Sequence, residues 1–347
     1  MVSSLYTPEG AMETPQDTTP VPPTMRVARA HHAGEPAVLG TDTVATPIPG
    51  PGEVLVRVHA AAANFPDALM VANRYQVATN YPFVPGYEAA GVIAARGNGS
   101  TAYSLGDRVA VLAADCFAEY VVAPETALTP VPAAVDLESA AAVFVCHLTA
   151  YHALRSVAGV RPGETLLVLG AGGGVGLAAV ELGTHLGARV IAAASSQDKL
   201  AAARTRGAVH TVDYGSGELR ERIRGAVGKS AVDVVIDPVG GALAEPALRE
   251  MAWGGRFVTI GYASGTIPRI PLNLVLLKGI TLSGFEIRTF AQRDPERDRR
   301  DRQEFLELWA SGAVTPLLHR RYRLDEAGAA LAEVAQRRAV GKVLVIP

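Results

Sequence analysis

The chain has 347 residues, of which 49% are hydrophobic and 19% are charged, and its formal net charge is −2 at pH 7. This length and apolar content predict a globular protein with two domains, and the near-neutral charge argues against nucleic acid as a partner, because phosphate binding needs a basic surface. Glycine, proline or a charged residue interrupts every long apolar stretch, so no membrane span is expected.

Residues 1–24 differ from the rest of the chain. Five prolines lie there among Thr, Ser and acidic residues, and almost nothing apolar is available for burial. This composition predicts a disordered tail. The tail also lacks the basic and then apolar pattern of a signal peptide, so we expect a cytoplasmic protein.

Residues 25–145 are expected to form a compact, mostly β domain with few helices. Glu53–Ala60 alternates polar and apolar residues directly after a Pro-Gly-Pro-Gly turn, which is the pattern of a half-buried strand. Similar short patterns, separated by turns, occur at Gly86–Ile93, Asp107–Leu112 and Phe117–Ala123.

Residues 146–285 are expected to form the second domain. The pattern is helical between Leu137 and Gly159, and strands and helices then alternate. This alternation predicts a doubly wound parallel sheet covered by helices on both faces, so the fold class is α/β. The expected strands are 165–169, 189–194, 209–212, 232–236, 256–260 and 280–284.

The first strand–helix–strand unit of this domain contains a glycine-rich turn. Leu166–Leu169 is an apolar strand, Gly170–Gly176 is the turn, and Leu177–Leu186 is helix-like. Small residues let the backbone approach a pyrophosphate, and a helix N-terminus offers free N–H groups and a partial positive charge. The turn therefore predicts a dinucleotide site, with a purely structural turn as the alternative. The expected contacts are Gly172, Gly173, Gly174, Val175 and Gly176.

The end of the second strand indicates which dinucleotide binds. An NAD site places Asp or Glu there, on the ribose 2′-hydroxyl. Here the strand ends in Ser195 and Ser196, with Lys199 one turn later. Hydroxyls and a cation suit a 2′-phosphate, so we predict NADPH rather than NADH. One serine can also be the N-cap of the following helix, and Asp198 fits its first turn.

Residues 286–347 begin with a highly charged segment. Asp294–Glu304 is almost wholly polar, which predicts a solvated helix face, and Phe305, Leu306, Leu308 and Trp309 are expected on its buried side. The segment after Gly341 reads as a strand that returns to the first domain.

The chain resembles the medium-chain dehydrogenase/reductase superfamily and, within it, the zinc-free NADPH:quinone oxidoreductases, which are zeta-crystallin-like. The resemblance implies a GroES-like β domain, a Rossmann domain that binds NADPH, a C-terminal return to the first domain, and an active cleft between the two. The motifs that carry it, in the family's order, are Asn64-Phe-Pro-Asp67, Pro82–Ile93, Gly106-Asp-Arg-Val, Leu148-Thr149-Ala-Tyr151, Ala171–Gly176, Gly255–Gly261 and Gly341-Lys-Val.

The zinc ligands of the metal-dependent relatives are missing from this sequence. Those relatives carry Gly-His-Glu where this chain has Gly86-Tyr87-Glu88, and a cysteine near the position of Asn64 to Asp67. A tyrosine is not a usual zinc ligand, and the two cysteines cannot form a four-cysteine structural site. We expect no metal, and we expect Cys146 and His147 in the core or cleft wall of a helix.

Without a metal to polarise an alcohol, the acceptor of hydride must already be electrophilic. Its oxygen gains negative charge, so hydrogen-bond donors should point at it. By resemblance, Asn64, Asp67 and Tyr75 line the cleft beside the nicotinamide as catalytic residues. The alternatives are a turn-forming role for Asn64 and a half-buried aromatic for Tyr75.

The resemblance also implies further cofactor contacts. Thr149 lies in the linking helix, Tyr214 is similar to a family tyrosine near the 2′-phosphate, and Lys342 is an additional candidate. Backbone groups of Gly261 and Tyr262 and the region of Phe285 are expected to face the nicotinamide ring.

We predict an NADPH-dependent reductase acting on a small-molecule quinone. The alternatives are an enoyl reductase for α,β-unsaturated carbonyls or thioesters, and a non-catalytic NADPH-binding protein. Arg293, Arg297, Arg299 and Arg300 alternate with acidic residues, which favours a solvated helix over a dock for a thioester's phosphate groups. The apolar strand Ile280–Gly284 would be a sheet edge, and the resemblance suggests that two subunits pair there as a homodimer.

Overall fold

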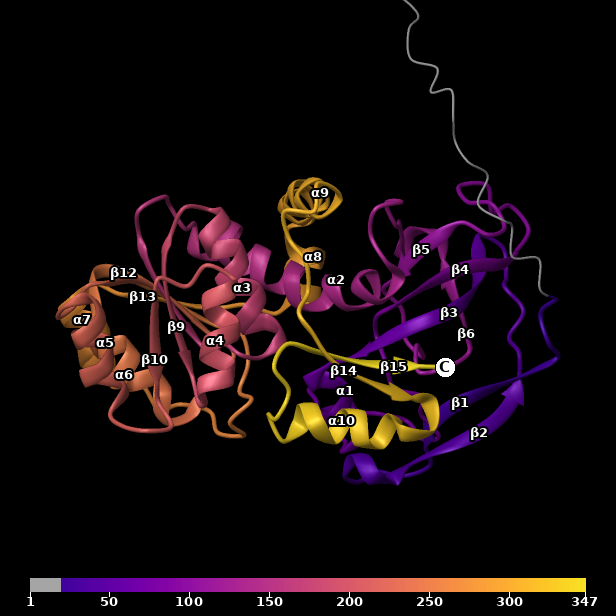
Figure 1. Ribbon diagram of the computed structural model, residues 1–347, viewed down its shortest axis with the longest axis horizontal. Coiled ribbons are helices and arrows are strands. Elements are labelled where there is room, and N and C mark those ends of the chain that lie inside the picture. The colour runs from indigo at the N-terminus through magenta and orange to yellow at the C-terminus, as the bar shows by residue number, and fades with distance from the viewer. Residues whose placement is uncertain (1–19) are drawn as a thin grey trace, which may run out of the picture.

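The computed structural model describes residues 20–347, so most of the tail expected at 1–24 lies outside the described residues. The chain forms two lobes, each built around its own sheet, with the helix α2 (Leu137–His152) between them (Figure 1). A π-helical segment, Ala153–Ala158, continues α2 and ends at Gly159, whose φ of 58° is left-handed. Glycine adopts this conformation without steric cost, so the helix ends there.

The first lobe contains a seven-stranded sheet of order β14-β15-β3-β4-β5-β7, with β6 paired to β3, and a separate antiparallel pair, β1 and β2. Leu55, Ile93 and Phe117 are among its fully buried side chains. The elements before α2 are β1 (Thr24–Ala30), β2 (Leu39–Ala45), β3 (Glu53–Ala63), α1 (Phe65–Val71), β4 (Ala89–Arg96), β5 (Arg108–Val111), β6 (Tyr120–Pro124), β7 (Leu128–Pro130), and 3-10 turns at Pro36–Val38 and Glu125–Ala127.

The second lobe is a six-stranded parallel sheet of order β10-β9-β8-β11-β12-β13. The strand order reverses between β8 and β11, and ligands of such sheets bind in the crevice at that point. Its elements are β8 (Thr165–Leu169), α3 (Gly174–His185), β9 (Arg189–Ala194), α4 (Gln197–Thr205), β10 (His210–Asp213), α5 (Leu219–Val227), β11 (Val232–Asp237), a 3-10 turn (Gly241–Leu243), α6 (Ala244–Arg249), β12 (Met251–Thr259), α7 (Leu272–Lys278) and β13 (Thr281–Gly284).

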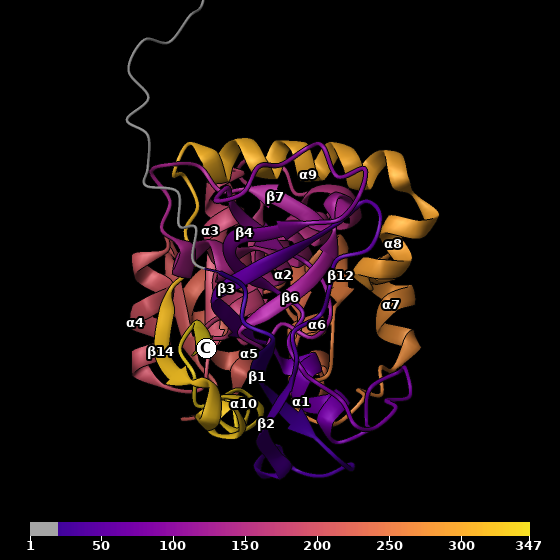
Figure 2. The same cartoon turned by 90° about the vertical axis from the view of Figure 1, so that its right-hand side faces the viewer.

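The chain then returns to the first lobe. In β15, Val343 pairs antiparallel with Ala63 of β3, and the other side of β15 pairs parallel with β14. Figure 2 shows α9 crossing the top of the molecule, and α10 on the side of the first lobe. These last elements are α8 (Ile287–Arg293), α9 (Pro295–Ala310), β14 (Leu318–Arg323), a 3-10 turn (Leu324–Glu326), α10 (Ala327–Ala335) and β15 (Lys342–Ile346).

The structure corrects one expectation for the charged segment. Phe305 and Trp309 of α9 are buried as expected, but Asp301 is also fully buried rather than solvated. His152 explains this burial, because its Nδ1 lies 3.0 Å from Asp301 Oδ2. The charged pattern of residues 294–304 does not reveal that Asp301 has a buried partner, His152, on another helix.

The expected fold class, a GroES-like β domain with a Rossmann parallel-sheet domain, is confirmed by these two sheets. Among residues 20–347, no helix has the length and apolar character that crossing a bilayer requires.

Candidate active site

Polar side chains from separate parts of the chain meet in one buried cluster in the first lobe. Lys342 opens β15, and its Nζ lies 2.6 Å from Glu88 Oε1 and 2.5 Å from Asn64 Oδ1. The amide of Asn64 donates to the same Glu88 oxygen at 2.9 Å. Cys146 of α2 completes the cluster, with Sγ 3.5 Å from Lys342 Nζ. Lys342 and Glu88 are 3% and 1% exposed, so the two charges compensate each other away from water.

Asp67 lies in the first turn of α1 beside this cluster. Its carboxylate accepts the backbone N–H of Asn64 at 2.8 Å, and the residue is 2% exposed. Burial raises the pKa of Asp67 to about 7, although the N–H of Asn64 and the charge of Lys342 oppose the shift. Asp67 can therefore hold or release a proton near neutral pH.

Tyr75 is half-buried, and the guanidinium carbon of Arg288 lies 5.5 Å from the centre of its ring. Burial raises the pKa of Tyr75 above its ordinary value, against the effect of the Arg288 charge, and the Asp67 charge also acts on it. Tyr75 is therefore a protonated hydrogen-bond donor at neutral pH. Sequence reasoning missed Arg288 at this position, because it comes from a distant helix, α8.

The glycine turn after β8 is closely packed, which explains its composition. Gly170 has a φ of 62°, and a Cβ on Gly176 would lie 2.1 Å from the carbonyl oxygen of Gly170. A Cβ on Gly172 would lie 2.3 Å from the Lys199 side chain, and one on Gly174 would lie 2.6 Å from Cys146 Sγ and 3.1 Å from Lys342 Cδ. The turn and the N-terminus of α3 thus lie directly beside the buried cluster.

The predicted 2′-phosphate residues lie near one another at the ends of β9 and β10. Ser196 is the N-cap of α4, but its hydroxyl makes no capping hydrogen bond. The backbone N–H of Tyr214 donates to the carbonyl oxygen of Ala194, next to Ser195, at 3.1 Å. Lys199 Nζ donates to the carbonyl oxygen of Arg337 at 2.5 Å.

Arg337 is a residue that the sequence reasoning missed at this position. It follows α10, more than 130 residues after Lys199, and its φ is 56°. Burial and the nearby Arg337 charge lower the pKa of Lys199, and the same charge acts on Tyr214. Two cations held beside each other form a favourable site for an anion.

The residues expected near the nicotinamide follow the carboxyl ends of β12 and β13. Phe285 is 7% exposed, and Gly261 and Tyr262 lie in the loop after β12. The hydroxyl of Thr149 donates to the carbonyl oxygen of Val145 at 2.6 Å, within α2. That hydroxyl can still accept a hydrogen bond.

Asp237, at the end of β11, is a third residue that sequence reasoning missed. Its Oδ1 accepts the backbone N–H groups of Val239 and Gly240, both at 2.8 Å. Its Oδ2 is buried and has no partner among the described residues. Because buried carboxylate oxygens rarely remain without a partner, this orphaned atom fits a site that takes a ligand hydroxyl group.

Comparisons with known proteins agree with this arrangement. Residues 50–133 match the family model of the alcohol dehydrogenase GroES-like domain, and residues 174–307 match that of the zinc-binding dehydrogenases. Quinone oxidoreductase-like protein 2 of Bos taurus is 38% identical over 297 residues, which is 85% of each chain. The chain belongs to the medium-chain dehydrogenase/reductase superfamily.

Other members of this superfamily extend the match. A quinone oxidoreductase of Pseudomonas aeruginosa is 33% identical over 317 residues, covering 90% of this chain and 97% of that protein. The crystal structure of the Escherichia coli quinone oxidoreductase complexed with NADPH has a TM-score of 0.85 and 28% identity, over 93% of this chain and 100% of that one. The resemblance stated from the sequence is thus confirmed.

The superfamily includes metal-dependent members, which makes the placement of possible metal ligands in this chain relevant. Among residues 20–347, no group of three or more His, Cys, Asp and Glu side chains is placed to hold a metal ion. Tyr87 is 46% exposed. Cys146 and His147 are buried in α2, and His147 Nε2 lies 3.1 Å from Glu181 Oε2.

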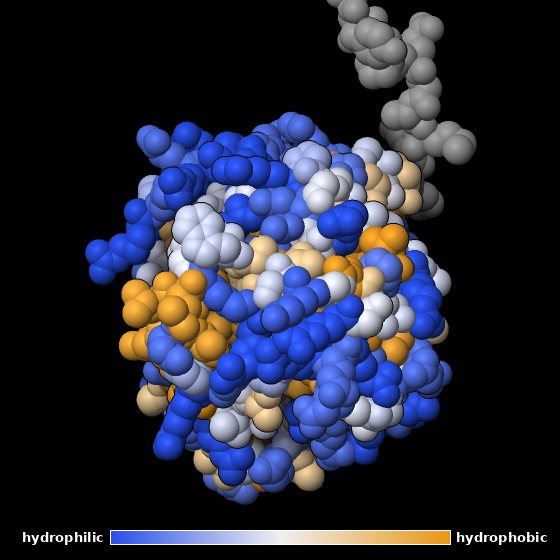
Figure 3. Space-filling view, turned by 90° about the vertical axis from the view of Figure 1, so that its left-hand side faces the viewer, coloured by the Kyte–Doolittle hydropathy of each residue, from blue (hydrophilic) through white to orange (hydrophobic). Residues whose placement is uncertain are grey.

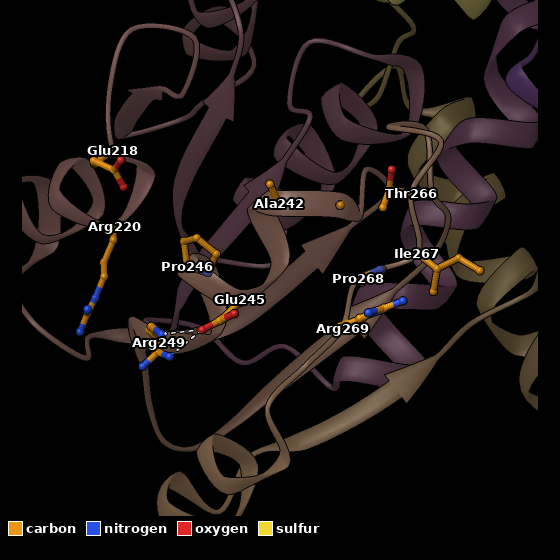
Figure 4. Close-up of a pocket in the computed structure, with 11 residues that line it drawn as sticks. Glu218, Arg220, Ala242, Glu245, Pro246, Arg249, Thr266, Ile267, Pro268 and Arg269 are labelled. Carbon is orange, nitrogen blue, oxygen red and sulfur yellow. Dashed lines mark hydrogen bonds and ion pairs between the residues drawn. The ribbon is translucent and has the colours of Figure 1, made fainter.

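A separate cavity of about 750 Å³ lies at the outer side of the second lobe, beyond the loop after β11 (Figure 4). It is lined by the turn at Gly241, by the start of α5 and by the loop at Thr266–Arg269. Arg249 and Glu245 on its wall are paired at 2.6 Å. None of the predicted site residues lines this cavity, so it is distinct from the site at the glycine turn.

Proposed function

We propose that the protein is an NADPH-dependent reductase that transfers hydride to a quinone. One observation carries the proposal: the backbone N–H of Gly341 donates to the carbonyl oxygen of Gly172 in the glycine turn at 2.9 Å, and the next residue, Lys342, holds the buried Asn64–Glu88 cluster. The dinucleotide loop of one lobe therefore lies against the polar residues of the other. A cofactor bound to that loop would reach towards Tyr75 and Asp67.

The residues fit NADPH along its length. Gly172, Gly173, Gly174, Val175 and Gly176 would hold the pyrophosphate with backbone N–H groups. Ser195, Ser196, Lys199 and Tyr214, joined by Arg337, would hold the 2′-phosphate. Thr149, Gly261, Tyr262 and Phe285 would border the nicotinamide end. When bound, NADPH supplies the hydride, and the protein supplies orientation and polar groups.

The first-lobe residues would act on the acceptor. Tyr75 donates a hydrogen bond to the oxygen that gains negative charge, and Asp67, with its pKa of about 7, supplies a proton. Asn64 has protein partners on each side of its amide: Ala62 and Glu88 accept, and Lys342 and Cys146 donate. This supports a positioning role for Asn64 and Lys342 rather than direct contact with the acceptor.

Zinc independence is part of the proposal. Tyr87 stands where metal-dependent relatives carry a histidine, and Lys342 forms an ion pair with the neighbouring Glu88. The Lys342 ammonium group supplies a positive charge beside Glu88, where a metal ion would otherwise do so. An ammonium group has no lone pair with which to bind a metal. A cytoplasmic location also remains a prediction from the sequence.

A second acceptor class has its own support. A Streptomyces orinoci protein named as part of the spectinabilin polyketide synthase system is 36% identical over 354 residues, matching 99% of this chain and 16% of that protein. This likeness supports the enoyl reductase alternative, because the same polar groups can assist reduction of a conjugated carbonyl.

The acceptor is tested by steady-state NADPH oxidation. We expect turnover with naphthoquinones or phenanthrenequinone and none with enones or crotonyl thioesters. The opposite result would establish the enoyl reductase. Tight NADPH binding without turnover on any acceptor would indicate the non-catalytic alternative.

We also propose a homodimer formed at the β13 edge of the second sheet. Figure 3 shows a group of apolar side chains on the surface of this end of the molecule. Leu272, Leu276 and Leu277 of α7 are 72%, 80% and 72% exposed, and Trp253 of the adjacent β12 is 82% exposed. An open strand edge beside such a patch is usually covered by a partner.

A further inference from the structure

Arg288 lies against Tyr75, although the two residues are far apart in the sequence. It lies in the first turn of α8, directly after β13, whereas Tyr75 and Tyr87 belong to the first lobe. Its guanidinium group stands 5.5 Å from the centre of the Tyr75 ring and within electrostatic reach of Tyr87. One cation and two aromatic rings thus lie close together, and the charge of the buried Asp67 acts on one of these rings, Tyr75.

The guanidinium group is only partly neutralised by its neighbours. Glu286 Oε1 lies 3.3 Å from Arg288 Nε, and the other carboxylate oxygen accepts the backbone N–H and hydroxyl of Thr289. Glu286 is therefore mainly engaged as the N-cap of α8. The Arg288 side chain is 45% exposed, so it is accessible to an anionic ligand from solvent.

Tyr87 adds a second aromatic ring near Arg288. The residues on both sides of it, Gly86 and Glu88, are buried, whereas Tyr87 is 46% exposed. Its ring therefore projects away from the buried cluster. An exposed and a half-buried aromatic ring favour a planar ligand, and a guanidinium group can bind the two oxygens of a carboxylate or sulfonate in a bidentate manner.

We propose that Arg288, with Tyr75 and Tyr87, makes the site selective for planar acceptors that carry an anionic group. The inference rests on the proposed reductase function and specifies its substrate class. Arg288 acts here as a specificity residue that binds the anionic substituent, whereas Tyr75 donates to the reacting oxygen. A neutral acceptor of the same shape gains the aromatic contacts alone.

The test compares 1,2-naphthoquinone with its 4-sulfonate, which share the reacting ring and differ by one charged group. Wild-type protein should show a higher kcat/KM for the sulfonate. In Arg288→Gln that preference, which is the ratio of the two kcat/KM values, should fall about tenfold, which equals about 1.4 kcal/mol of lost binding. Because Arg288 also lies against Tyr75, the neutral quinone measured on the same variant gives the loss that does not depend on the anionic group.

Two variants serve as controls. Arg288→Lys keeps the charge and should retain part of the preference, and Arg293→Gln, which removes a charge at the other end of α8, should leave it unchanged. An equal loss for both quinones in Arg288→Gln, or an unchanged preference, would overturn the inference. The inference would also be overturned if Arg293→Gln lowered the preference for the sulfonate as much as Arg288→Gln does.

A binding measurement separates this inference from the proposed function. Calorimetric titration of the NADPH-loaded protein with naphthalene-2-sulfonate needs no turnover. If neither quinone is reduced but Arg288→Gln still weakens the sulfonate about tenfold, the reductase proposal fails and the anion site stands. If quinones are reduced and the sulfonate binds both proteins equally, the anion site fails alone.

Discussion

At the scale of single residues, burial determines which protons the site holds. Asp67 is buried, and this burial raises its pKa to about 7. In the unfolded chain the same carboxyl ionises near pH 4. Between these two pH values the folded state holds a proton that the unfolded chain has lost, so the folded state becomes less stable as the pH rises from about 4 to about 7, and the loss levels off above that.

The first prediction concerns this proton. Between pH 5 and pH 8, the Asp67 titration should lower the free energy of unfolding by about 2–3 kcal/mol. Asp67→Asn cannot ionise and should lack this contribution, so its stability should depend less on pH over that range. Urea unfolding of both proteins at the two pH values measures the difference. Identical pH dependence in the two proteins would show that Asp67 titrates normally.

The second prediction concerns the 2′-phosphate. Lys199→Glu places a carboxylate beside Arg337 and should weaken NADPH at least tenfold while changing NADH little, because only NADPH carries the phosphate. Fluorescence titration with each nucleotide gives the two dissociation constants. Lys229→Glu, an exposed lysine elsewhere on the second lobe, controls for net charge. Equal losses for NADPH and NADH would contradict the assignment.

The same site shows how far single residues can be predicted. Ser195, Ser196 and Lys199 follow directly from the end of β9, since a parallel strand presents its carboxyl end to the ligand. Arg337 could not be found this way. It reaches the site from the loop after α10, through a left-handed backbone conformation at a non-glycine residue, and nothing local in the sequence indicates that path.

At the scale of elements, the strand-to-helix turn depends on close contact between α3 and β8. The packing at Gly176 is the tightest part, because the contacting atom is backbone and cannot move aside. Gly173, three residues earlier, has an ordinary φ of −86°. The nearest atom to a Cβ there is 3.6 Å away.

The third prediction uses this contrast. Gly176→Ala should destabilise the protein by about 1–3 kcal/mol, since an inserted methyl group forces the backbone apart. Gly173→Ala should change stability by less than about 1 kcal/mol. Urea unfolding without nucleotide measures both and excludes effects on binding. Equal destabilisation would mean that the turn relaxes more freely than its packing implies.

The elements themselves were mostly predictable. The expected strands 165–169 and 189–194 coincide with β8 and β9, because buried parallel strands form short apolar runs between turns. β12 begins at Met251 instead of 256, since Met251 pairs with Val232 across an irregularity in register. Gly254 and Gly255 interrupt the apolar pattern, so the sequence did not indicate that the strand begins at Met251.

At the scale of the whole molecule, the patch on α7 and β12 bears on assembly. The fourth prediction is that the wild-type protein is a dimer and that Leu276→Glu is a monomer, because a charge in an apolar interface lacks compensation. Light scattering after size exclusion measures the mass. Ile48→Glu, at a residue that is 90% exposed in the other lobe, should stay dimeric. A monomeric wild-type protein would contradict the proposed pairing.

The two-lobe plan was also predictable, because the order of the motifs placed a β domain before the glycine turn and a returning strand after it. The buried cluster was not. Asn64 and Lys342 were each candidates, but their contact through Glu88 joins the end of β3, the start of β4 and the start of β15. Distances of this kind depend on the assembled sheet and leave no local pattern.

The position of β15 has a consequence for how the protein is made. This strand lies between β14 and β3, and it leaves the ribosome after everything else in its sheet. During synthesis, the edge of β3 stays open and Glu88 lacks its ammonium partner for some 250 residues. The first lobe can therefore complete its sheet and its buried ion pair only after residues 342–346 have been synthesised.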